Sequence, residues 1–273
     1  MRIGRIGYVN CYPVYGAMDR GIVVPPGTLV TGTPAELNDR LAEGRLDVSV
    51  ISAVAYAQHA DVLELLPDLA ISSDGPVRSV ILFSRRPPAE LGGARVLVSS
   101  ASRTSVLLLD LLARERWGVT LVTTPAPTEA GDLGRLATSP HDAVLVIGDA
   151  ALLLGAQRAY PYQMDLGEEW QRWTGLPFVF AVWAARRDVD RKAVHDVHRA
   201  LVASRRWGLA HLGDLAEQAA RVTDVDLGDC VEYLTGLDYG LSYRHLAGLT
   251  DFLRRLAARG LVPDGTLAFV GAA

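Results

Sequence analysis

The sequence predicts a two-lobed α/β protein. Apolar runs typical of buried strands alternate with helical runs over most of the 273 residues, a pattern that indicates parallel sheets with helices on both faces. The chain is also longer than the roughly 100–150 residues that one hydrophobic core usually organises. Pro87-Pro88 breaks the pattern before it restarts at Arg95. We therefore expect an inserted lobe and a ligand cleft between the two lobes.

The first lobe is expected to open with two strands and a capped helix. Residues 2–9 and 28–31 are apolar runs of β type. Thr33 can cap the following helix, because Pro34 suits its first turn and Glu36 completes a capping box. Strand and helix thus alternate from the start of the chain.

Two more strands and a short helix complete the amino-terminal part of this lobe. The strands are expected at residues 47–51 and 77–84, and Ser52 opens the helix between them. We expect residues 1–85 and 186–273 to form the discontinuous first lobe, and residues 86–185 to form the inserted second lobe.

The second lobe repeats the alternation, and the chain ends in helices. The expected strands of the inserted lobe are residues 95–98, 121–123 and 143–147, and the apolar strand 178–185 returns toward the first lobe. The expected helices after it are residues 191–212, 214–221, 229–234 and 243–259.

Composition excludes several classes of function. Hydrophobic residues make up 49% of the chain, charged residues 21%, and the net charge is −4. No basic stripe is present, so nucleic acid is not an expected partner. No apolar run reaches the ~18 residues of a membrane helix, and the start carries no secretory signal pattern. Cys11 and Cys230 are the two cysteines and form no CxxC pair, so we expect a cytoplasmic protein without disulfides.

A polar turn at residues 99–105 is the first candidate binding element. Ser102, Arg103, Thr104 and Ser105 stand where a strand ends and a helix begins. A helix start offers unpaired N–H groups and partial positive charge, which suit a carboxylate or a phosphate. The alternative reading is that Ser102 or Thr104 only caps the helix.

Three further polar positions follow predicted strands or lie within them. Asp149 follows the strand at 143–147, where α/β sheets carry their sites, and could act as a base or orient a hydroxyl; the alternative is an ordinary helix cap. Asn10 ends the first strand and offers both a donor and an acceptor. Arg78 and Ser79 are adjacent in a strand, so one of them can face the cleft while the other faces solvent.

Aromatic residues near 178 and several absences complete the reading. Phe178, Phe180 and Trp183 could wall a pocket, although composition alone favours core packing for them. The six histidines form no metal-binding signature, and neither a P-loop nor GxGxxG occurs. We therefore expect no metal and no cofactor.

Several segments together resemble the chorismate dehydratase family of menaquinone biosynthesis, in the futalosine route. The similar segments are GYVNCYP, TPAELNDRLAEGRLDVSVISAVAY, RSVILFS, SSASRTS, AVLVIGDAAL and DLGEEWQRWTGLPFVFAVW, spread in order over residues 7–183. The resemblance implies a type II periplasmic-binding-protein fold. It also implies a lyase that converts chorismate to 3-[(1-carboxyvinyl)oxy]benzoate and water without metal.

The resemblance extends to a sister enzyme that acts on cyclic dehypoxanthine futalosine. That enzyme uses a histidine in the turn after the middle-lobe strand, where this chain reads Gly148-Asp149, and this difference favours the dehydratase. The residues expected to be catalytic are Asp149, Ser79 and Asn10. The residues expected to bind substrate are Ser52, Ser102, Arg103, Thr104, Ser105 and Phe178.

Two readings of another kind stay open at this stage. A solute receptor of a transporter shares this fold and binds without chemistry, and it would be exported. An effector-sensing domain of a transcription regulator normally follows a helix-turn-helix, whereas this chain opens on a strand. The oligomeric state, monomer or homodimer, is not determined by the sequence.

Overall fold

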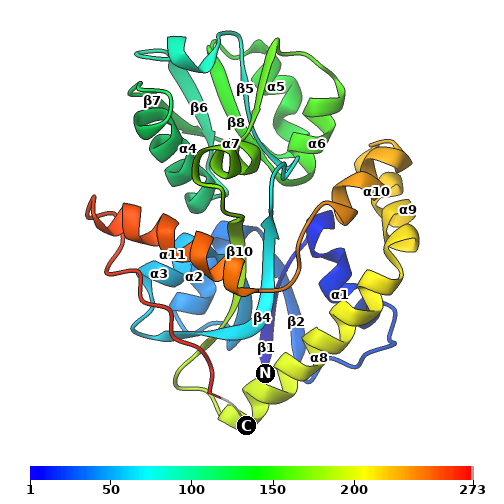
Figure 1. Cartoon of the computed structure of the whole chain (residues 1–273). Coiled ribbons are helices and arrows are strands. Elements are labelled where there is room, and N and C mark those ends of the chain that lie inside the picture. Colours follow the sequence, from blue (N-terminus) through cyan, green and yellow to red (C-terminus); the bar gives the residue numbers. More distant parts are fainter. Residues whose placement is uncertain (272–273) are drawn as a thin grey trace.

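The chain folds into two lobes, each built on one sheet (Figure 1). The structure is a computed structural model and describes residues 1–271. Within these residues the two five-stranded sheets have the orders β2-β1-β3-β10-β4 and β7-β6-β8-β5-β9. The predicted two-lobed α/β class is confirmed.

The first sheet combines the start of the chain with two longer strands. β1 is parallel to both β2 and β3, whereas β10 runs antiparallel to β3 and β4. The strands are β1 (Arg2–Ile6), β2 (Thr28–Gly32), β3 (Val48–Ser52), β4 (Leu63–Ser73) and β10 (Phe178–Arg186).

The second sheet lies wholly within the middle of the chain. β6 is parallel to β7 and β8, whereas β5 runs antiparallel to β8 and β9. The strands are β5 (Val80–Ser84), β6 (Arg95–Ser99), β7 (Val122–Ala126), β8 (Ala143–Ile147) and β9 (Tyr162–Asp165).

The expectation of parallel sheets is wrong, because both sheets are mixed. β5 and β10 are the strands that follow the two crossings between lobes. Each of these two strands runs antiparallel to both of its neighbours. The alternation of strands and helices along the sequence does not reveal strand direction.

These pairings also move the expected lobe boundaries. Residues 77–84 were expected to end the first lobe, but β5 pairs in the second sheet. The strand at 178–185 was expected to close the second lobe, but β10 pairs in the first sheet. We therefore propose crossings between β4 and β5 and between residues 175 and 178. Pro87-Pro88 then lies in a connection inside the second lobe.

The helices follow most sequence signals closely. The predicted capping box of α2 is confirmed, since Thr33 Oγ1 accepts from Glu36 N at 3.3 Å and Glu36 Oε2 accepts from Thr33 N at 2.9 Å. The helices are α1 (Tyr12–Asp19), α2 (Pro34–Ala42), α3 (Ala53–Gln58), α4 (Arg103–Glu115), α5 (Leu133–Thr138), α6 (Gly148–Ala156), α7 (Leu166–Thr174), α8 (Arg191–Ala210), α9 (Leu212–Thr223), α10 (Leu227–Thr235) and α11 (Tyr243–Ala257). Short 3-10 turns are η1 (Val9–Cys11), η2 (Pro88–Glu90) and η3 (Ala130–Asp132).

β4 is a strand that the sequence analysis missed. Pro67 and Asp68 interrupt its apolar pattern, and Asp68 adopts a positive φ of 55°. The pairing of β4 with β10 also shifts register twice. Such irregularities bend a strand and hide its period from the sequence.

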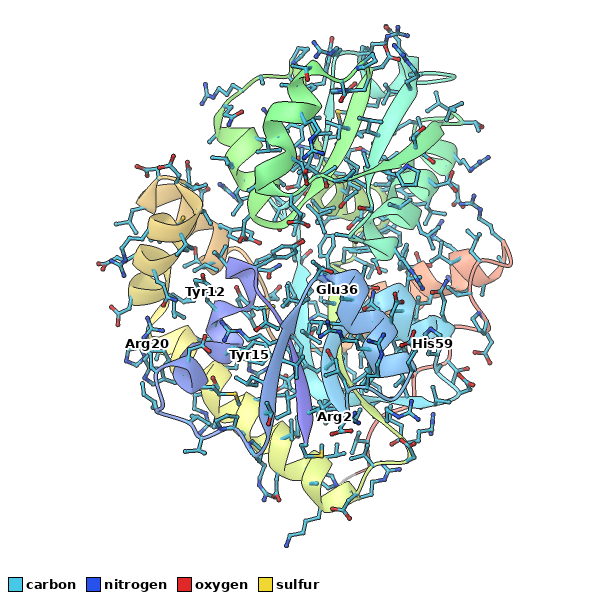
Figure 2. All side chains as sticks on the ribbon, turned by 180° about the vertical axis from the view of Figure 1, so that it is seen from behind. Arg2, Tyr12, Tyr15, Arg20, Glu36 and His59 are labelled. Carbon is cyan, nitrogen blue, oxygen red and sulfur yellow. The ribbon has the colours of Figure 1, made fainter. Side chains whose placement is uncertain are left out.

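Helices packed on the first sheet give that lobe its core. Tyr15 of α1 lies beside the first sheet (Figure 2). Its hydroxyl donates to the Gly4 carbonyl at 2.9 Å and accepts from Trp183 Nε1 at 2.9 Å. The C-terminal helices α8, α9 and α10 then rise along the molecule, so that α10 stands beside α6 of the second lobe (Figure 1). None of the helices in residues 1–271 has the length and apolarity needed to cross a bilayer.

Candidate active site

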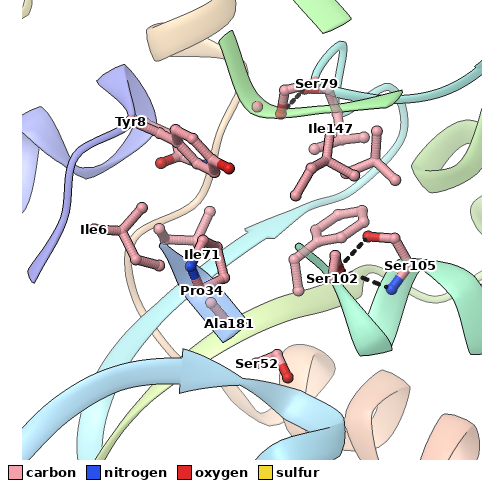
Figure 3. Close-up of a pocket in the computed structure, with 15 residues that line it drawn as sticks. Ile6, Tyr8, Pro34, Ser52, Ile71, Ser79, Ser102, Ser105, Ile147 and Ala181 are labelled. Atoms are coloured by element: carbon pink, nitrogen blue, oxygen red, sulfur yellow. Dashed lines mark hydrogen bonds between the residues drawn. The ribbon is translucent and has the colours of Figure 1, made fainter. Parts of the chain in front are cut away.

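A pocket lies between the two lobes, at the ends of strands from both sheets (Figure 3). Its volume is about 570 Å³, including space open to solvent. It is lined by Ile6, Tyr8, Asn10, Pro34, Ser52, Ile71, Val77, Ser79, Val80, Ser102, Ser105, Ile147, Gly148, Phe180 and Ala181. Five of the predicted site residues, namely Asn10, Ser52, Ser79, Ser102 and Ser105, therefore meet in one hollow.

The polar lining of the pocket is uncharged. Within residues 1–271, none of the lining side chains belongs to lysine, arginine, histidine or an acid. Anion binding here must therefore rely on hydroxyl, amide and backbone N–H donors. Helix starts supply such donors together with partial positive charge.

The start of α4 presents two hydroxyls to the pocket. Ser102 caps the helix, since its Oγ accepts from Ser105 N at 3.2 Å. The Ser102 hydroxyl donates to Ser105 Oγ at 2.9 Å (Figure 3). This leaves the Ser105 hydroxyl proton available for a guest. Capping and binding, which the sequence presented as alternatives, are compatible at this turn.

The start of α6 differs because no side chain caps it in the described part of the chain. Gly148 adopts a positive φ of 63°, and its N–H donates to the Ser79 carbonyl at 2.8 Å. A Cβ at this position would stand 2.9 Å from Cε2 of Tyr8. Glycine is therefore required both by the backbone conformation and by the closeness of the Tyr8 ring.

Asp149 does not line the pocket. Its Oδ1 accepts from the backbone N–H of Val9 at 3.1 Å and so ties the second lobe to η1, which carries Asn10. Burial raises the pKa of Asp149 to about 6, while the Val9 N–H opposes this rise and Glu129 adds to it. The catalytic role expected for Asp149 stays a prediction.

Tyr8 and Glu129 form a second tie on the same side of the cleft. The Tyr8 hydroxyl donates to Glu129 Oε1 at 2.7 Å, and the two residues come from opposite lobes. Burial, and then Glu129, raise the pKa of the Tyr8 phenol, so it stays protonated. The sequence analysis quoted Tyr8 only as part of a segment and gave Glu129 no role, because nothing in the sequence pairs positions so far apart.

Ser52 and Ser79 bring their hydroxyls to the pocket from different lobes. Ser52 Oγ accepts from Ala55 N at 3.2 Å and from Asn38 Nδ2 at 3.3 Å, which fixes the serine at the start of α3. Ser79 Oγ reaches only the Val77 carbonyl, at 3.4 Å. The Ser79 hydroxyl is thus weakly engaged and free to turn toward a guest.

Three residues expected to bind substrate lie elsewhere. Thr104 is buried, and its Oγ1 accepts from Val54 N at 3.0 Å. The Arg103 side chain lies outside the pocket and pairs with Asp39 at 3.3 Å. Phe178 is fully buried in the first lobe, and Phe180 lines the pocket in its place.

Solved structures define the class of fold. The alkanesulfonate-binding protein of Xanthomonas axonopodis pv. citri, solved with MOPS, aligns with a TM-score of 0.71 at 17% identity over 98% of this chain and 96% of its own. The chain therefore has the periplasmic-binding-protein fold, as the resemblance implied.

Sequence comparison defines the family. A family model described as menaquinone biosynthesis matches residues 1–258, and the chain belongs to that family. A chorismate dehydratase of Thermus thermophilus is 36% identical over 82% of this chain and 84% of its own length. A 1,4-dihydroxy-6-naphtoate synthase of Streptomyces coelicolor is 28% identical over 92% of this chain and 90% of its own length.

Proposed function

We propose that this protein is a chorismate dehydratase, which converts chorismate to 3-[(1-carboxyvinyl)oxy]benzoate and water. The observation that carries the proposal is the interlobe pocket, whose polar lining is uncharged and includes the Ser102 and Ser105 hydroxyls at the start of α4. Such a site suits a small dianion that changes its charge distribution without a cofactor. The 36% identity to a named chorismate dehydratase supports the same reaction.

The reaction needs two bonds to break in one ring. The ring C3–H bond gives up its proton, and the C4–O bond breaks so that hydroxide leaves and takes up a proton as water. The electron pair from C3–H becomes part of the aromatic ring. Negative charge moves onto the ring carboxylate as the proton leaves, so donors fixed at that carboxylate stabilise the transition state.

We assign the carboxylate contacts to the second lobe. Ser105 stands at the start of α4 with its hydroxyl proton free, and Ser102 orients that hydroxyl by donating to Ser105 Oγ at 2.9 Å. The charge-assisted hydrogen bond that Ser105 would make is stronger than a neutral one. Asn10 and Ser79 then contact the ring side of the substrate. Asp149 lies outside the pocket lining, so we assign it the positioning of η1, which carries Asn10, through the 3.1 Å bond from Val9 N.

The base in this proposal is the substrate itself. The enolpyruvyl carboxylate of chorismate can take the C3 proton if the site holds it near that carbon. Proximity of this kind can contribute several kcal/mol to catalysis. The ties from Tyr8 to Glu129 and from Val9 to Asp149 keep the lobes closed around such a geometry and so exclude water.

A second candidate is the naphtoate synthase reaction on cyclic dehypoxanthine futalosine. The match of 28% identity over 92% of this chain favours it. The turn after β8 argues against it, because it reads Gly148-Asp149 where the resemblance implies a histidine.

The test is an assay of the purified chain with each of the two substrates, without added metal. We expect chorismate to lose water, with product followed by absorbance and chromatography. Asn10→Ala and Ser79→Ala should lower turnover by about 10-fold or more. Ser84→Ala is the matched control, since Ser84 ends the same strand and bonds to the Arg86 carbonyl at 2.7 Å, away from the pocket. Chorismate returned unchanged would contradict the proposal. Turnover of cyclic dehypoxanthine futalosine instead would favour the second candidate, and turnover of neither substrate would favour a binding protein.

A further inference from the structure

The segment that crosses from β4 to β5 carries one wall of the pocket. It comprises residues 74–79, and its Val77 and Ser79 line the cavity, where Figure 3 shows the Ser79 side chain. The Ser79 hydroxyl reaches only the Val77 carbonyl, at 3.4 Å, which is too long to fix its direction. The place of this hydroxyl therefore depends on what holds the backbone of the segment.

Arg78, directly before Ser79, has an unfavourable backbone conformation. Its φ is 61°, in the left-handed region that residues other than glycine rarely adopt. Such a conformation persists only where surrounding contacts hold it. The Arg78 guanidinium pairs with Glu232, but the two side chains are 38% and 61% exposed, and exposed pairs contribute little. The contacts that hold Arg78 must therefore act on its backbone.

Asp165 supplies these contacts from the end of β9. Its Oδ2 accepts from Arg78 N at 2.6 Å, and its Oδ1 accepts from Val77 N at 3.0 Å. The same Oδ1 caps α7, since it also accepts from Gly167 N at 2.9 Å and from Glu168 N at 3.1 Å. One carboxylate thus joins the start of α7 to two successive N–H groups of the crossing segment.

The start of α7 packs against the crossing segment without room to shift. A Cβ at Gly167 would stand 2.7 Å from the Gly75 carbonyl oxygen and 2.8 Å from Ser73 Oγ. Glycine is needed here for the close approach of the two backbones. The Asp165 carboxylate therefore has a fixed base on α7 from which it holds the segment.

We propose that Asp165 is a positioning residue of this site, which holds Arg78 in its left-handed conformation and so directs the Ser79 hydroxyl toward the substrate. The Ser79 carbonyl accepts from Gly148 N at 2.8 Å, so the backbone is fixed on the other side of Arg78 as well. Asp165 does not line the interlobe pocket, and it acts through the peptide backbone. The inference rests on the proposed function for the role of Ser79 and for the identity of the substrate.

Asp165→Asn in the full chain separates the two tasks of the carboxylate. The amide oxygen can keep the bonds of Oδ1 and with them the cap of α7, whereas the amide nitrogen would place a donor opposite Arg78 N. We expect kcat to fall roughly 10-fold with KM changed less than about 3-fold, because Ser79 is misplaced in the transition state. Circular dichroism and urea unfolding show whether the variant is folded under the assay conditions.

Asp190→Asn is the matched control. Asp190 also caps a helix, α8, where its Oδ1 accepts from Ala193 N at 2.9 Å. It is exposed and lies outside the pocket, so the variant loses the same charge at a helix start without touching the crossing segment. We expect its kcat and KM to stay within about twofold of the wild type. Equal turnover of the two variants would overturn the inference.

Two substitutions of Arg78 test the backbone conformation while Asp165 is intact. Arg78→Gly and Arg78→Val both remove the side chain and its pair with Glu232. Glycine adopts a φ of 61° freely, whereas a β-branched valine strongly opposes it. We expect Arg78→Gly to keep kcat within about twofold of the wild type and Arg78→Val to lower it about 5-fold or more. Equal kcat of these two variants would overturn the inference even where Asp165→Asn does not fold.

A double-mutant cycle shows whether Asp165 acts through Ser79. If it does, Asp165→Asn combined with Ser79→Ala should be no slower than Ser79→Ala alone. A merely structural role of Asp165 would lower the turnover of the double variant further, and such additive losses would overturn the inference.

The variants are assayed on whichever of the two family substrates the wild-type chain consumes. Turnover of cyclic dehypoxanthine futalosine but not of chorismate overturns the proposed function alone, and the comparison of variants is then decided on that substrate. Turnover of neither overturns both. Turnover of chorismate with a fully active Asp165→Asn variant overturns only the inference about Asp165.

Discussion

Two helices of the second lobe, α4 and α6, begin at the same pocket but are held to the first lobe differently. α4 is capped by Ser102, and its Thr104 accepts from the backbone of Val54. α6 has no side-chain cap and begins at a left-handed glycine packed under Tyr8. Its tie to the first lobe is the buried carboxylate of Asp149.

This difference separates a neutral side of the cleft from a titrating side. At its pocket end, the buried polar contacts of α4 are made by hydroxyls and peptide groups, which do not change charge near neutral pH. The contacts of α6 include a carboxylate with a pKa of about 6, and the Tyr8–Glu129 bond joins η3 to the first lobe on the same side of the cleft. Substitutions at the start of α6 should therefore have larger effects on stability and turnover, and these effects should depend on pH. Substitutions at the start of α4 should have modest effects that do not depend on pH.

The largest effect is expected from Gly148→Ala. The new Cβ would need the left-handed backbone and would meet three Tyr8 ring atoms at 2.9–3.1 Å. We expect a loss of about 3–5 kcal/mol in the free energy of unfolding or, if the lobes open instead, a loss of turnover. Urea unfolding and the turnover assay measure the two outcomes.

Gly155→Ala is the matched control in the same helix. A Cβ there would stand 3.7 Å from Gln163 Oε1, which is an ordinary contact. Alanine is a better helix former, so this variant should be slightly stabilised, by about 0.5–1 kcal/mol. Equal behaviour of the two variants would contradict the special role of the α6 start.

Asp149→Asn should give the next largest effect, and the effect should depend on pH. The folded state holds the Asp149 proton up to pH about 6, above the usual value of 3.8. The wild-type protein therefore loses stability as pH rises through this window. Asparagine carries no charge and can still accept from Val9 N, so the variant should be more stable by about 2 kcal/mol at pH 8 and equal near pH 4.

Urea unfolding of the variant and the wild type at the two pH values measures the difference in their free energies of unfolding. If that difference is the same at both pH values, the buried charge is not its cause. Turnover of the same variant reports on chemistry. Loss of activity in a folded Asp149→Asn protein supports a proton donor, whereas full activity leaves Asp149 only the role of a tie between lobes.

Ser102→Ala tests the neutral side. Loss of the α4 cap should cost about 1 kcal/mol at any pH. The affinity for substrate should also fall, because the hydroxyl that orients Ser105 toward the carboxylate is removed. Ser242→Ala is the control, because Ser242 caps α11 outside the pocket. If both variants lose similar stability but only Ser102→Ala loses affinity for substrate, the result supports substrate binding at the start of α4. If both variants bind substrate as tightly as the wild type, Ser102 is excluded from the site.

Arg103→Ala should have the smallest effect. The pair with Asp39 is half exposed, at 50% and 49%, and such pairs contribute about 0–1 kcal/mol. We expect KM and kcat within about twofold of the wild type. A large rise in KM would show that the arginine turns into the cleft with substrate and that the α4 side also uses charge.

The side of the α4 start on which each residue lies explains which of the predicted site residues reach the pocket. Ser102 and Ser105 are three residues apart and share one side of the helix start, whereas Arg103 and Thr104 point elsewhere. The helical period could have separated them. The sequence named Phe178, Phe180 and Trp183 together as possible pocket walls, and it could not single out Phe180. β10 is mostly buried, and a register shift between Val179 and Ala181 changes which side chains face the pocket.

The sequence by itself determined the alternation of strands and helices, the caps at Thr33, Ser52 and Ser102, and the polar positions at strand ends. These features depend on neighbours within a few residues, so their physical causes lie within each segment. The tertiary structure alone decided which sheet takes β5 and β10, and that Tyr8 meets Glu129 and Val9 meets Asp149. Such contacts join residues more than a hundred positions apart, and only the packed chain fixes which distant groups share a buried space.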